Sequence, residues 1–509
     1  MQTMTDLVLL LPDDSDRHPE AREVRSIVKM QRATVASVQV PRINDDGSLD
    51  ARAFVDFHHQ HGVDLSTIDP IFRLRDIILV QLPFMDERPP VTFCLVYLWN
   101  WPGSTYDIDA VRIPHASWTD PRNNPRGKNP GNVWSFPTRD RGDGERSRSF
   151  GRGMPIAAVE RLVRCHSLAG DTVHGWLPGD EEGLVAGVAA RAGRRFKAID
   201  HGDADPVVAM PFDVDPGGGA SSDIDGRDGT VTVLQGCKEH PLARYFIQDA
   251  ITGIPARVDE PIVDVVTSPP YNIGYDPFNV PKPDPRNGQL VAPRKAGYRD
   301  DLPRAVYRGM IKRVLDAIDA RMNPASADAF INMKNAYSGG ACDPPFWVAG
   351  LVPRGWRLSD LLVWRYDISY DPAKGKYKPY YEWILRFTRG TIHRRDGHRY
   401  LQDHYIPILK GNSKERLRLV HPAIYPKKLV KTCLAESGHE GLVVDPFLGS
   451  GTTIAAAWEA NRPSIGFEID PRYLPDIETR LLQATRAAST IDAQGSIIPK
   501  EKITMTRVE

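Results

Sequence analysis

The chain has 509 residues, of which 41% are hydrophobic and 26% charged, and its 65 basic residues balance 65 acidic ones. This length and composition exclude a disordered chain and a single small domain, and they predict two or three globular domains. The zero net charge excludes a global field that attracts nucleic acid, so any DNA contact must be a local patch.

The five cysteines lie far apart and include no CxxC pair. This spacing predicts neither a disulfide framework nor a metal site, and we expect the cysteines to be reduced core residues. The chain contains no apolar run of about 18 residues and starts without a basic lead-in to its short apolar stretch. We therefore expect a cytoplasmic protein that makes no contact with a membrane.

In chain order, two apolar strands are predicted first, one directly after Asp6 and one over Phe72–Val80. Residues 120–152 then form a long basic stretch in which arginines alternate with Trp134 and Phe136. Arginines among aromatic rings suit contacts with phosphates and bases, although a solvated loop fits equally well. The following residues 201–230 are rich in Gly and Asp and are predicted to be a flexible linker.

The apolar run over 263–267 reads as a buried strand that ends at Ser268-Pro269-Pro270-Tyr271. The two prolines remove backbone donors and leave carbonyl oxygens as acceptors at the strand end. Ser268 adds a further acceptor, and Tyr271 offers a flat face for a planar ring. This combination fits a ring that bears an amino group, whereas an isolated motif of this kind is more often a structural turn.

Between this motif and the next, a helix is predicted over 307–318 and strands over 329–333, 361–364 and 383–387. The Pro-rich loop 274–299 is expected to close over a site. Lysines at 374, 376 and 378 alternate with tyrosines, which suits an extruded base and its phosphates as well as a solvated loop. The segment Asp343–Phe346 resembles the catalytic pattern but follows no apolar strand, so a helix start is favoured.

A second motif spans 443–453, where an apolar strand leads through Asp445 and a glycine turn into an Ala-rich helical run. The next strand ends at Glu468, where a ribose hydroxyl would be bound. This is the nucleotide-binding half of a doubly wound sheet. Because the loop lacks the Gly-Lys-Ser/Thr of a P-loop, the pattern favours a cofactor without a polyphosphate.

Together these residues resemble the prokaryotic DNA amino-methyltransferases that use S-adenosylmethionine. The matching motifs are 267–271, 421–426 and 445–453, and their order is that of the permuted class called β. The resemblance covers about residues 230–480 and implies Ser268, Pro269, Pro270 and Tyr271 as catalytic residues. It implies the following cofactor-binding residues: Asp249, His421, Asp445, Pro446, Phe447, Gly449, Gly451, Thr452, Thr453 and Glu468.

The resemblance implies methyl transfer to an exocyclic amino group of a flipped-out base in double-stranded DNA, in a restriction-modification or related defence system with a companion endonuclease. Ser268 favours N4 of cytosine, because family members with Ser before the prolines are mostly N4-cytosine enzymes and those with Asp mostly N6-adenine enzymes. A nucleophilic Cys next to Pro, needed for cytosine C5 chemistry, is missing. An N6-adenine enzyme, an RNA substrate and a non-catalytic DNA-binding scaffold remain as alternatives.

Residues 1–205 echo the C-terminal half. Phe72–Val80 mirrors Trp356–Trp364, and at one constant offset in the numbering Gly175 replaces Asp445 and Ala198 replaces Glu468. We expect an α/β fold in which the doubly wound, Rossmann-like methyltransferase sheet occurs twice. The predicted domains are a degenerate copy over 1–205 that possibly reads DNA, a linker over 206–230, a catalytic domain over 231–485 and a tail over 486–509. An unrelated α/β domain with chance matches is the alternative for the first.

Overall fold

The computed structural model describes most of the predicted elements. The described residues are 6–11, 21–41, 68–81, 93–113, 125–136, 154–177, 181–199, 231–234, 243–272, 301–338, 341–365, 379–393, 424–487 and 505–508, with short pieces at 44, 49–50, 54, 65, 282–283, 290–291, 377, 403–405 and 421. The predicted linker over 206–230, most of the loop 274–299 and the lysines at 374, 376 and 378 lie outside them.

The N-terminal half forms a seven-stranded sheet with helices on both faces. In spatial order the strands are β5 (Val133–Trp134), β3 (Arg73–Gln81), β4 (Phe93–Asn100), β2 (Thr34–Gln39), β1 (Leu7–Leu10), β6 (Thr172–Trp176) and β7 (Arg195–Ala198). The helices are α1 (Ala21–Gln31), α3 (Ile156–His166) and α4 (Glu181–Arg191). Alternate residues of β1 enter two different core clusters, one shared with α1 and one shared with α3 and α4.

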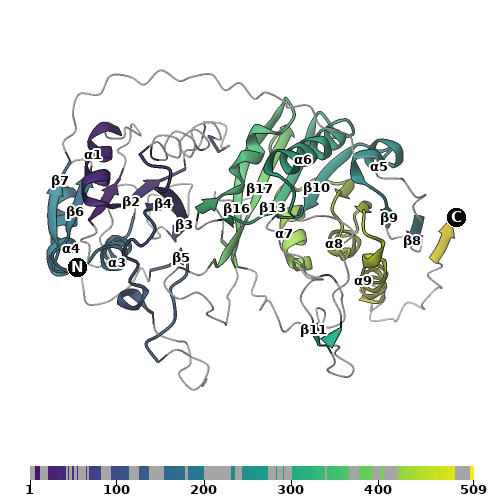
Figure 1. Cartoon of the computed structure of the whole chain (residues 1–509). Helices are drawn as coiled ribbons and strands as arrows, with labels where there is room; N and C mark the ends of the chain where they lie inside the picture. The colour runs from purple at the N-terminus through teal and green to yellow at the C-terminus, as the bar shows by residue number, and fades with distance from the viewer. Residues whose placement is uncertain are drawn as a thin grey trace, which may run out of the picture.

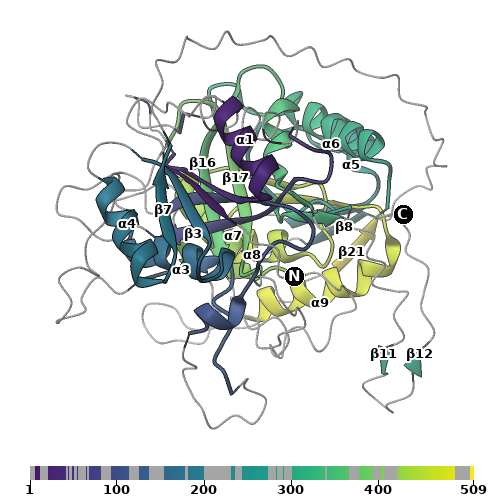
Figure 2. The ribbon, with the colours of Figure 1, turned by 60° about the vertical axis from the view of Figure 1, so that its left-hand side comes forward.

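The C-terminal half forms a ten-stranded sheet. In spatial order its strands are β18 (Asp403–Tyr405), β16 (Trp356–Arg365), β17 (Tyr381–Gly390), β13 (Ser326–Met333), β10 (Ile262–Thr267), β19 (Leu442–Asp445), β20 (Ser464–Glu468), β9 (Ala243–Ile247), β8 (Val231–Leu234) and β21 (Met505–Val508). Its helices are α5 (Ala250–Arg257), α6 (Arg304–Asp319), α7 (Lys427–Ser437), α8 (Thr452–Glu459) and α9 (Leu474–Ala487). Figure 2 shows α5 and α6 together, apart from α8 and α9.

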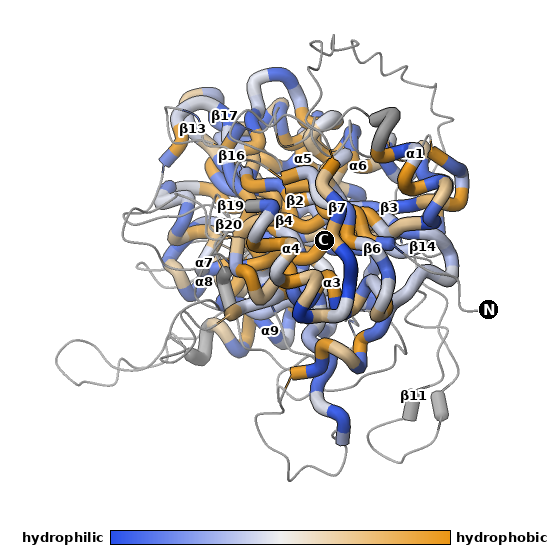
Figure 3. The backbone as a smooth tube through the Cα atoms, turned by 90° about the vertical axis from the view of Figure 1, so that its left-hand side faces the viewer, coloured by the Kyte–Doolittle hydropathy of each residue, from blue (hydrophilic) through white to orange (hydrophobic). Residues whose placement is uncertain are grey.

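Two shorter hairpins complete the described strands: β11 (Lys282–Pro283) with β12 (Leu290–Val291), and β14 (Ala336–Ser338) with β15 (Ala341–Asp343). The predicted tail contributes β21, which pairs antiparallel with β8 at the sheet edge. Residues 505–508 of the predicted tail 486–509 therefore form an edge strand of the C-terminal sheet. Hydrophobic residues gather along the strands in the interior of the molecule (Figure 3), because both faces of each sheet are covered, although the C-terminal strands also bury polar groups such as Asp328 and Arg386.

The seven strands of the N-terminal sheet repeat the first seven strands of the C-terminal sheet in the same order and with the same directions. The repeat extends to an irregularity: the register shifts between Leu74 and Asp76 in β3, and between Leu358 and Asp360 in β16. In each case the aspartate accepts a hydrogen bond from the next backbone N–H. A shared bulge at the same place confirms that the fold occurs twice.

The strand ladders also give a residue-by-residue correspondence. Starting from Leu74 in the place of Leu358 and stepping across the paired strands, Gly175 takes the place of Asp445, as the sequence predicts. The predicted match of Ala198 with Glu468 is wrong, because the ladders pair Ala198 with Gly175 but Asp445 with Gly466. The loop before β7 differs in length, and this shifts the counterpart of Glu468 to position 200, outside the described residues.

The two halves lie side by side and share one continuous hydrophobic cluster, which runs from Val8 and Trp99 in the N-terminal half to Tyr381 and Phe467 in the C-terminal half. Figure 1 shows β3 and β16 facing each other across this junction. Because apolar side chains of both sheets are buried in the same cluster, the two halves pack together as one unit.

A buried charged cluster lies at the amino end of the central C-terminal strands. Asp328 and Arg386 are fully buried and pair at 2.7 Å, while Asp264 pairs with Arg462 at 2.8 Å and His439 lies 3.2 Å from Asp328. Burial raises the pKa of Asp264 to about 7, against the opposing effect of Arg462. Asp264, Asp328 and His439 have the composition of a metal site, but both carboxylates are already neutralised by guanidinium groups. We therefore interpret the cluster as a structural ion-pair network.

Cys94, Cys165, Cys342 and Cys433 are free and buried, which confirms the prediction for these four; Cys237 lies outside the described residues. Their thiols are therefore core residues, and burial raises the pKa of Cys94 and Cys165 to about 12. None of the helices in the described part of the chain combines the length and the apolar character needed to span a bilayer.

Arg386→Met is expected to lower the free energy of unfolding by about 3–5 kcal/mol, because Asp328 then stays buried without its guanidinium partner. Urea denaturation measures the change. The double variant Arg386→Met/Asp328→Leu removes both charges and is expected to recover most of the loss. A single-variant loss within about 1 kcal/mol, the range of an exposed pair, would show that the buried pair contributes little.

Candidate active site

The predicted catalytic tip follows β10 directly, at the carboxyl edge of the sheet. Ser268, Pro270 and Tyr271 are half-buried, and Pro269 is buried. The carbonyl of Pro270 is not a free acceptor, since the Tyr307 hydroxyl donates to it at 2.5 Å. Asn272 closes the turn with φ near 51° and exchanges two hydrogen bonds with the backbone of Leu302. The other acceptors of the tip are the Ser268 hydroxyl and the Pro269 carbonyl.

A chain of hydrogen bonds connects this tip to a carboxylate that the sequence did not single out. Ser268 Oγ lies 2.9 Å from the Tyr271 hydroxyl, which donates to Glu382 Oε2 at 2.8 Å. A tyrosine hydroxyl has one hydrogen, so Ser268 must be the donor to Tyr271. Ser268 Oγ therefore keeps its acceptor capacity, part of which meets a long hydrogen bond of 3.4 Å from Asn332 Nδ2.

Asn332, at the end of β13, completes this network. Its amide nitrogen lies 3.0 Å from both the Tyr271 hydroxyl and Glu382 Oε2. Asn332 and Glu382 are each only 2% exposed. Asn332 Oδ1 is buried and has no hydrogen-bond partner among the residues that the structure describes. Such an orphaned acceptor beside a reactive tip suits a ligand that brings N–H donors.

The ring of Tyr271 is only partly free for stacking. Lys334 follows Asn332 in the chain, and its ammonium lies over the ring, 4.7 Å from the centroid. This cation–π contact covers one face of the ring. A planar ring that stacks on Tyr271 therefore uses the opposite face or displaces Lys334.

Asp445 accepts hydrogen bonds from residues of all three predicted motifs, 267–271, 421–426 and 445–453. Its carboxylate is fully buried and accepts a hydrogen bond from Thr267 at 2.7 Å, which ties β19 to the catalytic strand. The other oxygen accepts from Tyr425 at 3.0 Å, so the third motif meets the same group. Burial raises the pKa of Asp445, whereas hydrogen bonds from Thr267, the Phe447 N–H and Tyr425 lower it. Asp445 thus acts first as a structural hub.

The glycine turn after β19 is a close-fitting cradle. Gly449 and Gly451 have φ near 54° and 81°, and a Cβ on Gly449 would lie 2.9 Å from His421 Nε2. The backbone N–H of Gly449 donates to Glu468 at 2.7 Å, and the N–H of Asp470 donates to the other carboxylate oxygen at 2.8 Å. Burial raises the pKa of Glu468 to about 8, although these backbone bonds lower it.

The remaining predicted cofactor residues have local roles. The Thr453 hydroxyl donates to the carbonyl of Val266, Phe447 packs half-buried, and Thr452 begins α8. Asp249 lies after β9, where its side chain caps α5 by accepting from the N–H of Ile251 at 2.9 Å. The structure thus brings Thr267, Asp445 and Glu468 to one edge but engages Asp249 only as a helix cap. Pro446 is buried within the turn.

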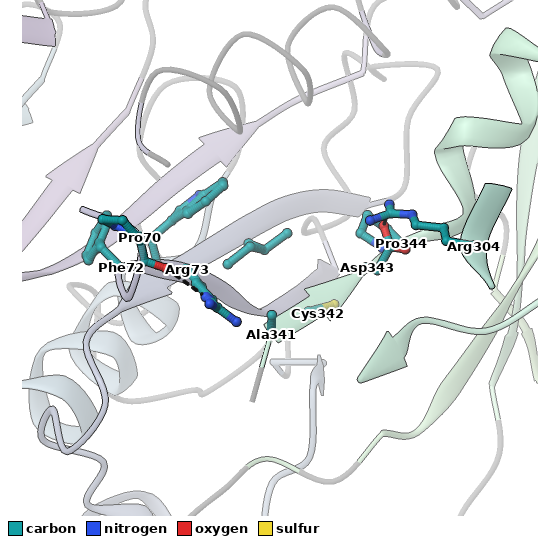
Figure 4. Close-up of a pocket in the computed structure, with 10 residues that line it drawn as sticks. Pro70, Phe72, Arg73, Arg304, Ala341, Cys342, Asp343 and Pro344 are labelled. Atoms are coloured by element: carbon teal, nitrogen blue, oxygen red, sulfur yellow. Dashed lines mark hydrogen bonds and ion pairs between the residues drawn. The ribbon is translucent and has the colours of Figure 1, made fainter. Parts of the chain in front are cut away.

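The structure also describes one cavity between the two halves, with a volume of about 430 Å³ (Figure 4). It is lined by Pro70, Phe72, Arg73, Leu74, Trp99, Arg304, Ala341, Cys342, Asp343 and Pro344. Asp343 pairs there with Arg304 at 2.8 Å, and Pro345 begins a 3-10 helix. The prediction of a helix start for the Asp343–Phe346 segment is confirmed.

Residues 263–479 match the family model described as DNA methylase, of the N6/N4 type. This segment is therefore similar to DNA amino-methyltransferases. The match covers less than half of the chain and includes the catalytic tip, Asn332, Glu382 and the glycine turn. The whole N-terminal half lies outside it.

Among curated proteins, the chain is similar to the orphan methyltransferase M.BamHII of Bacillus amyloliquefaciens, with 26% identity over 29% of this chain and 70% of that protein. It is 42% identical to the type II methyltransferase M.ScaI of Streptomyces caespitosus, over 13% of this chain and 22% of that protein. It is 26% identical to the type II methyltransferase M.HpaI of Haemophilus parainfluenzae, over 29% of this chain and 52% of that protein.

Solved structures similar to part of the chain include the PvuII DNA methyltransferase (cytosine-N4-specific), with 18% identity and a TM-score of 0.34, over 48% of this chain and 91% of that one. The M1.HpyAVI–SAM complex has 16% identity to this chain and a TM-score of 0.32, and the match covers 47% of this chain and 99% of that one.

The methylase segment is expected to lose stability as the pH rises. Because the folded pKa of Glu468, about 8, lies above its ordinary value of 4.5, the native state binds the proton more tightly than the unfolded state. Protonated Glu468 therefore contributes its full stabilisation of the folded state below about pH 4.5, and this stabilisation is lost as the pH rises to about 8.

Urea denaturation at pH 5.5 and pH 8 checks this by comparison with Glu468→Gln, which cannot ionise. Between pH 5.5 and pH 8, the free energy of unfolding of the wild type is expected to fall by about 1–3 kcal/mol more than that of the variant. Other groups, Asp264 among them, titrate in both proteins and cancel in the difference. Equal pH profiles would show that Glu468 ionises normally in the folded protein.

Proposed function

We propose that the chain is an S-adenosylmethionine-dependent DNA methyltransferase that modifies the N4 amino group of cytosine in a flipped-out base. One observation carries the proposal: the hydrogen bond between Thr267 and Asp445 places the catalytic tip beside the glycine turn, whose Gly449 N–H donates to Glu468. An acceptor-rich tip next to a nucleotide cradle suits the transfer of a group to an amine. The DNA methylase match over 263–479 supports the same class.

The glycine turn fits S-adenosylmethionine. Gly449 and Gly451 let the turn pack closely against His421 and Ile477, where a Cβ would be crowded, and the carboxylate of Glu468 is placed to accept from ribose hydroxyls. When bound, this cofactor supplies an electrophilic methyl group on a sulfonium. His421, which contacts the Tyr473 ring at 4.4 Å and lies against Gly449, would form one wall.

The residues at the tip hold the amino group and take up its proton. An exocyclic amine is a weak nucleophile, because its lone pair is delocalised into the ring. Ser268 Oγ and the Pro269 carbonyl accept its two N–H bonds and favour a tetrahedral nitrogen, with Asn332 Oδ1 as a further acceptor. Methyl transfer would form the new N–C bond and break the sulfur–methyl bond of the cofactor, which would leave as a neutral thioether. The amino proton would then pass to Ser268, the Ser268 proton to Tyr271 and the Tyr271 proton to Glu382.

The choice of cytosine rests on Ser268, the residue before the prolines. N6-adenine methylation keeps the same mechanism and is the runner-up. Double-stranded DNA is the proposed substrate, with a companion restriction endonuclease as a proposed partner. Base flipping is required in either case, because the amino group in a duplex cannot reach a tip at the sheet edge.

DNA incubated with the purified protein and S-adenosylmethionine is expected to contain N4-methylcytosine, measured by mass spectrometry of nucleosides. Ser268→Ala and Glu382→Gln are each expected to lower the rate about 10²-fold, since the first removes an acceptor and the second the final proton acceptor. Tyr97→Phe, which removes a buried hydroxyl of the N-terminal half that bonds Gln39, is the control. N6-methyladenine would overturn the base assignment, and no methylated nucleoside on any DNA would favour a scaffold.

Calorimetry is expected to find one S-adenosylmethionine site per chain, because Gly175 stands where the methylase segment has Asp445. Asp445→Ala is expected to abolish binding, since it removes the acceptor of Thr267, Tyr425 and the N–H of Phe447. Two sites in the wild type would contradict a degenerate N-terminal copy. Circular dichroism of Asp445→Ala separates loss of the site from loss of the fold.

A further inference from the structure

The two halves meet through reciprocal contacts. In the N-terminal half, the connection between β2 and β3 reaches the bulge of β16, where the N–H of Leu49 donates to the carbonyl of Ser359 at 3.2 Å. In the C-terminal half, the equivalent connection reaches the bulge of β3, where the Tyr337 hydroxyl donates to Asp76 at 3.2 Å. Equivalent surfaces that contact each other in both directions define a local two-fold relation, as in an isologous dimer.

The N-terminal half uses this position to hold the segment that leads into β17. Tyr377 is 3% exposed and inserts into an aromatic box. Its N–H donates to the Tyr106 hydroxyl at 2.6 Å, and its own hydroxyl lies 3.2 Å from His166 Nε2. Its ring meets that of Trp134 edge-on, with the centroids 5.4 Å apart. All three partners belong to the N-terminal half.

Tyr380 and Tyr381 also form hydrogen bonds to residues of the N-terminal half. The N–H of Tyr380 donates to Asn132 Oδ1 at 2.9 Å, and the Tyr381 hydroxyl donates to the carbonyl of Ile77 at 2.9 Å. The ring of Tyr380 lies so close to Gly131 that a Cβ there would be 2.1 Å from its Cδ2 atom. Gly131 has φ near 66°, so this close approach requires glycine.

Glu382 follows Tyr381 directly. Its carboxylate ends the hydrogen-bond chain from Ser268 through Tyr271, and its backbone position is the first one after the segment that the N-terminal half holds. In the N-terminal half, by contrast, the ladder counterparts of the network are apolar or weakly polar. They are Leu11 for Ser268, Val38 for Asn332 and Cys94 for Glu382.

We propose that the N-terminal half is a built-in positioning subunit, which fixes Glu382 in the catalytic network by holding the segment from Tyr377 to Tyr381. This inference rests on the proposed function. It assigns the degenerate half a role in the rate of methyl transfer that is separate from any contact with DNA. Asn132 acts through Tyr380 and is a positioning residue, since it does not touch the tip.

The test uses the full chain and single-turnover transfer of labelled methyl groups to genomic DNA. Asn132→Ala removes the acceptor of the Tyr380 N–H and one donor to Asp76. Tyr337→Phe removes another donor to the same oxygen of Asp76 but removes no donor or acceptor of the Tyr377 or Tyr380 N–H, so it is the matched control. Asn132→Ala is expected to lower the rate about tenfold or more, with an unchanged Kd for S-adenosylmethionine, and Tyr337→Phe is expected to stay within about twofold of wild type.

A double-mutant cycle separates positioning from general destabilisation. If Asn132 acts through Glu382, then Asn132→Ala adds no further loss on the Glu382→Gln background. An equal fold-loss on both backgrounds, or a wild-type rate for Asn132→Ala, overturns the inference and leaves the methyltransferase proposal standing. A wild-type protein that methylates no DNA overturns both.

Should Asn132→Ala fail to fold by circular dichroism, Tyr106→Phe replaces it. This change keeps the ring but removes the acceptor of the Tyr377 N–H. It is expected to give the same non-additive loss of rate with Glu382→Gln. Additive losses or an unchanged rate count against the inference as before.

Discussion

The fully buried carboxylate of Asp445 is the group on which the candidate active site depends. It accepts hydrogen bonds from Thr267 at the catalytic strand, from Tyr425 in the third motif and from the N–H of Phe447 in the glycine turn. A buried carboxylate is stable only when its lone pairs are satisfied, so these three segments must stay in register. The tip after β10 and the glycine turn after β19 are therefore placed by one shared acceptor.

Sequence reasoning located the parts of the site that lie at strand ends. Ser268, Asp445 and Glu468 follow apolar strands, and the carboxyl ends of parallel strands meet at one edge of a sheet. It missed Glu382 and Asn332, because both lie within strands that read as buried and apolar. The available signal was a carboxylate between Tyr381 and Trp383, since a charged residue in a buried strand needs a partner.

The internal repeat was predictable in outline but not in detail. The Phe72–Val80 pattern matched the C-terminal strand because a bulge fixes an aspartate at the same position in both halves. The match of Ala198 with Glu468 failed because strand register depends on loop length, which an ungapped offset ignores. The contacts of Asn132 with Tyr380 could not be predicted, since they connect residues far apart in sequence without any motif.

The N-terminal half has Val38 and Cys94 at the ladder counterparts of Asn332 and Glu382. Partly satisfied polar networks are costly in a low-dielectric interior, so these residues spare this half the need to satisfy a buried carboxylate and amide. The reciprocal junction between the halves has a further consequence. Because both of its surfaces belong to one polypeptide, their association is intramolecular and does not follow mass action. Dilution that would separate two subunits therefore leaves this pairing intact, so the junction between the halves does not depend on the concentration of the protein.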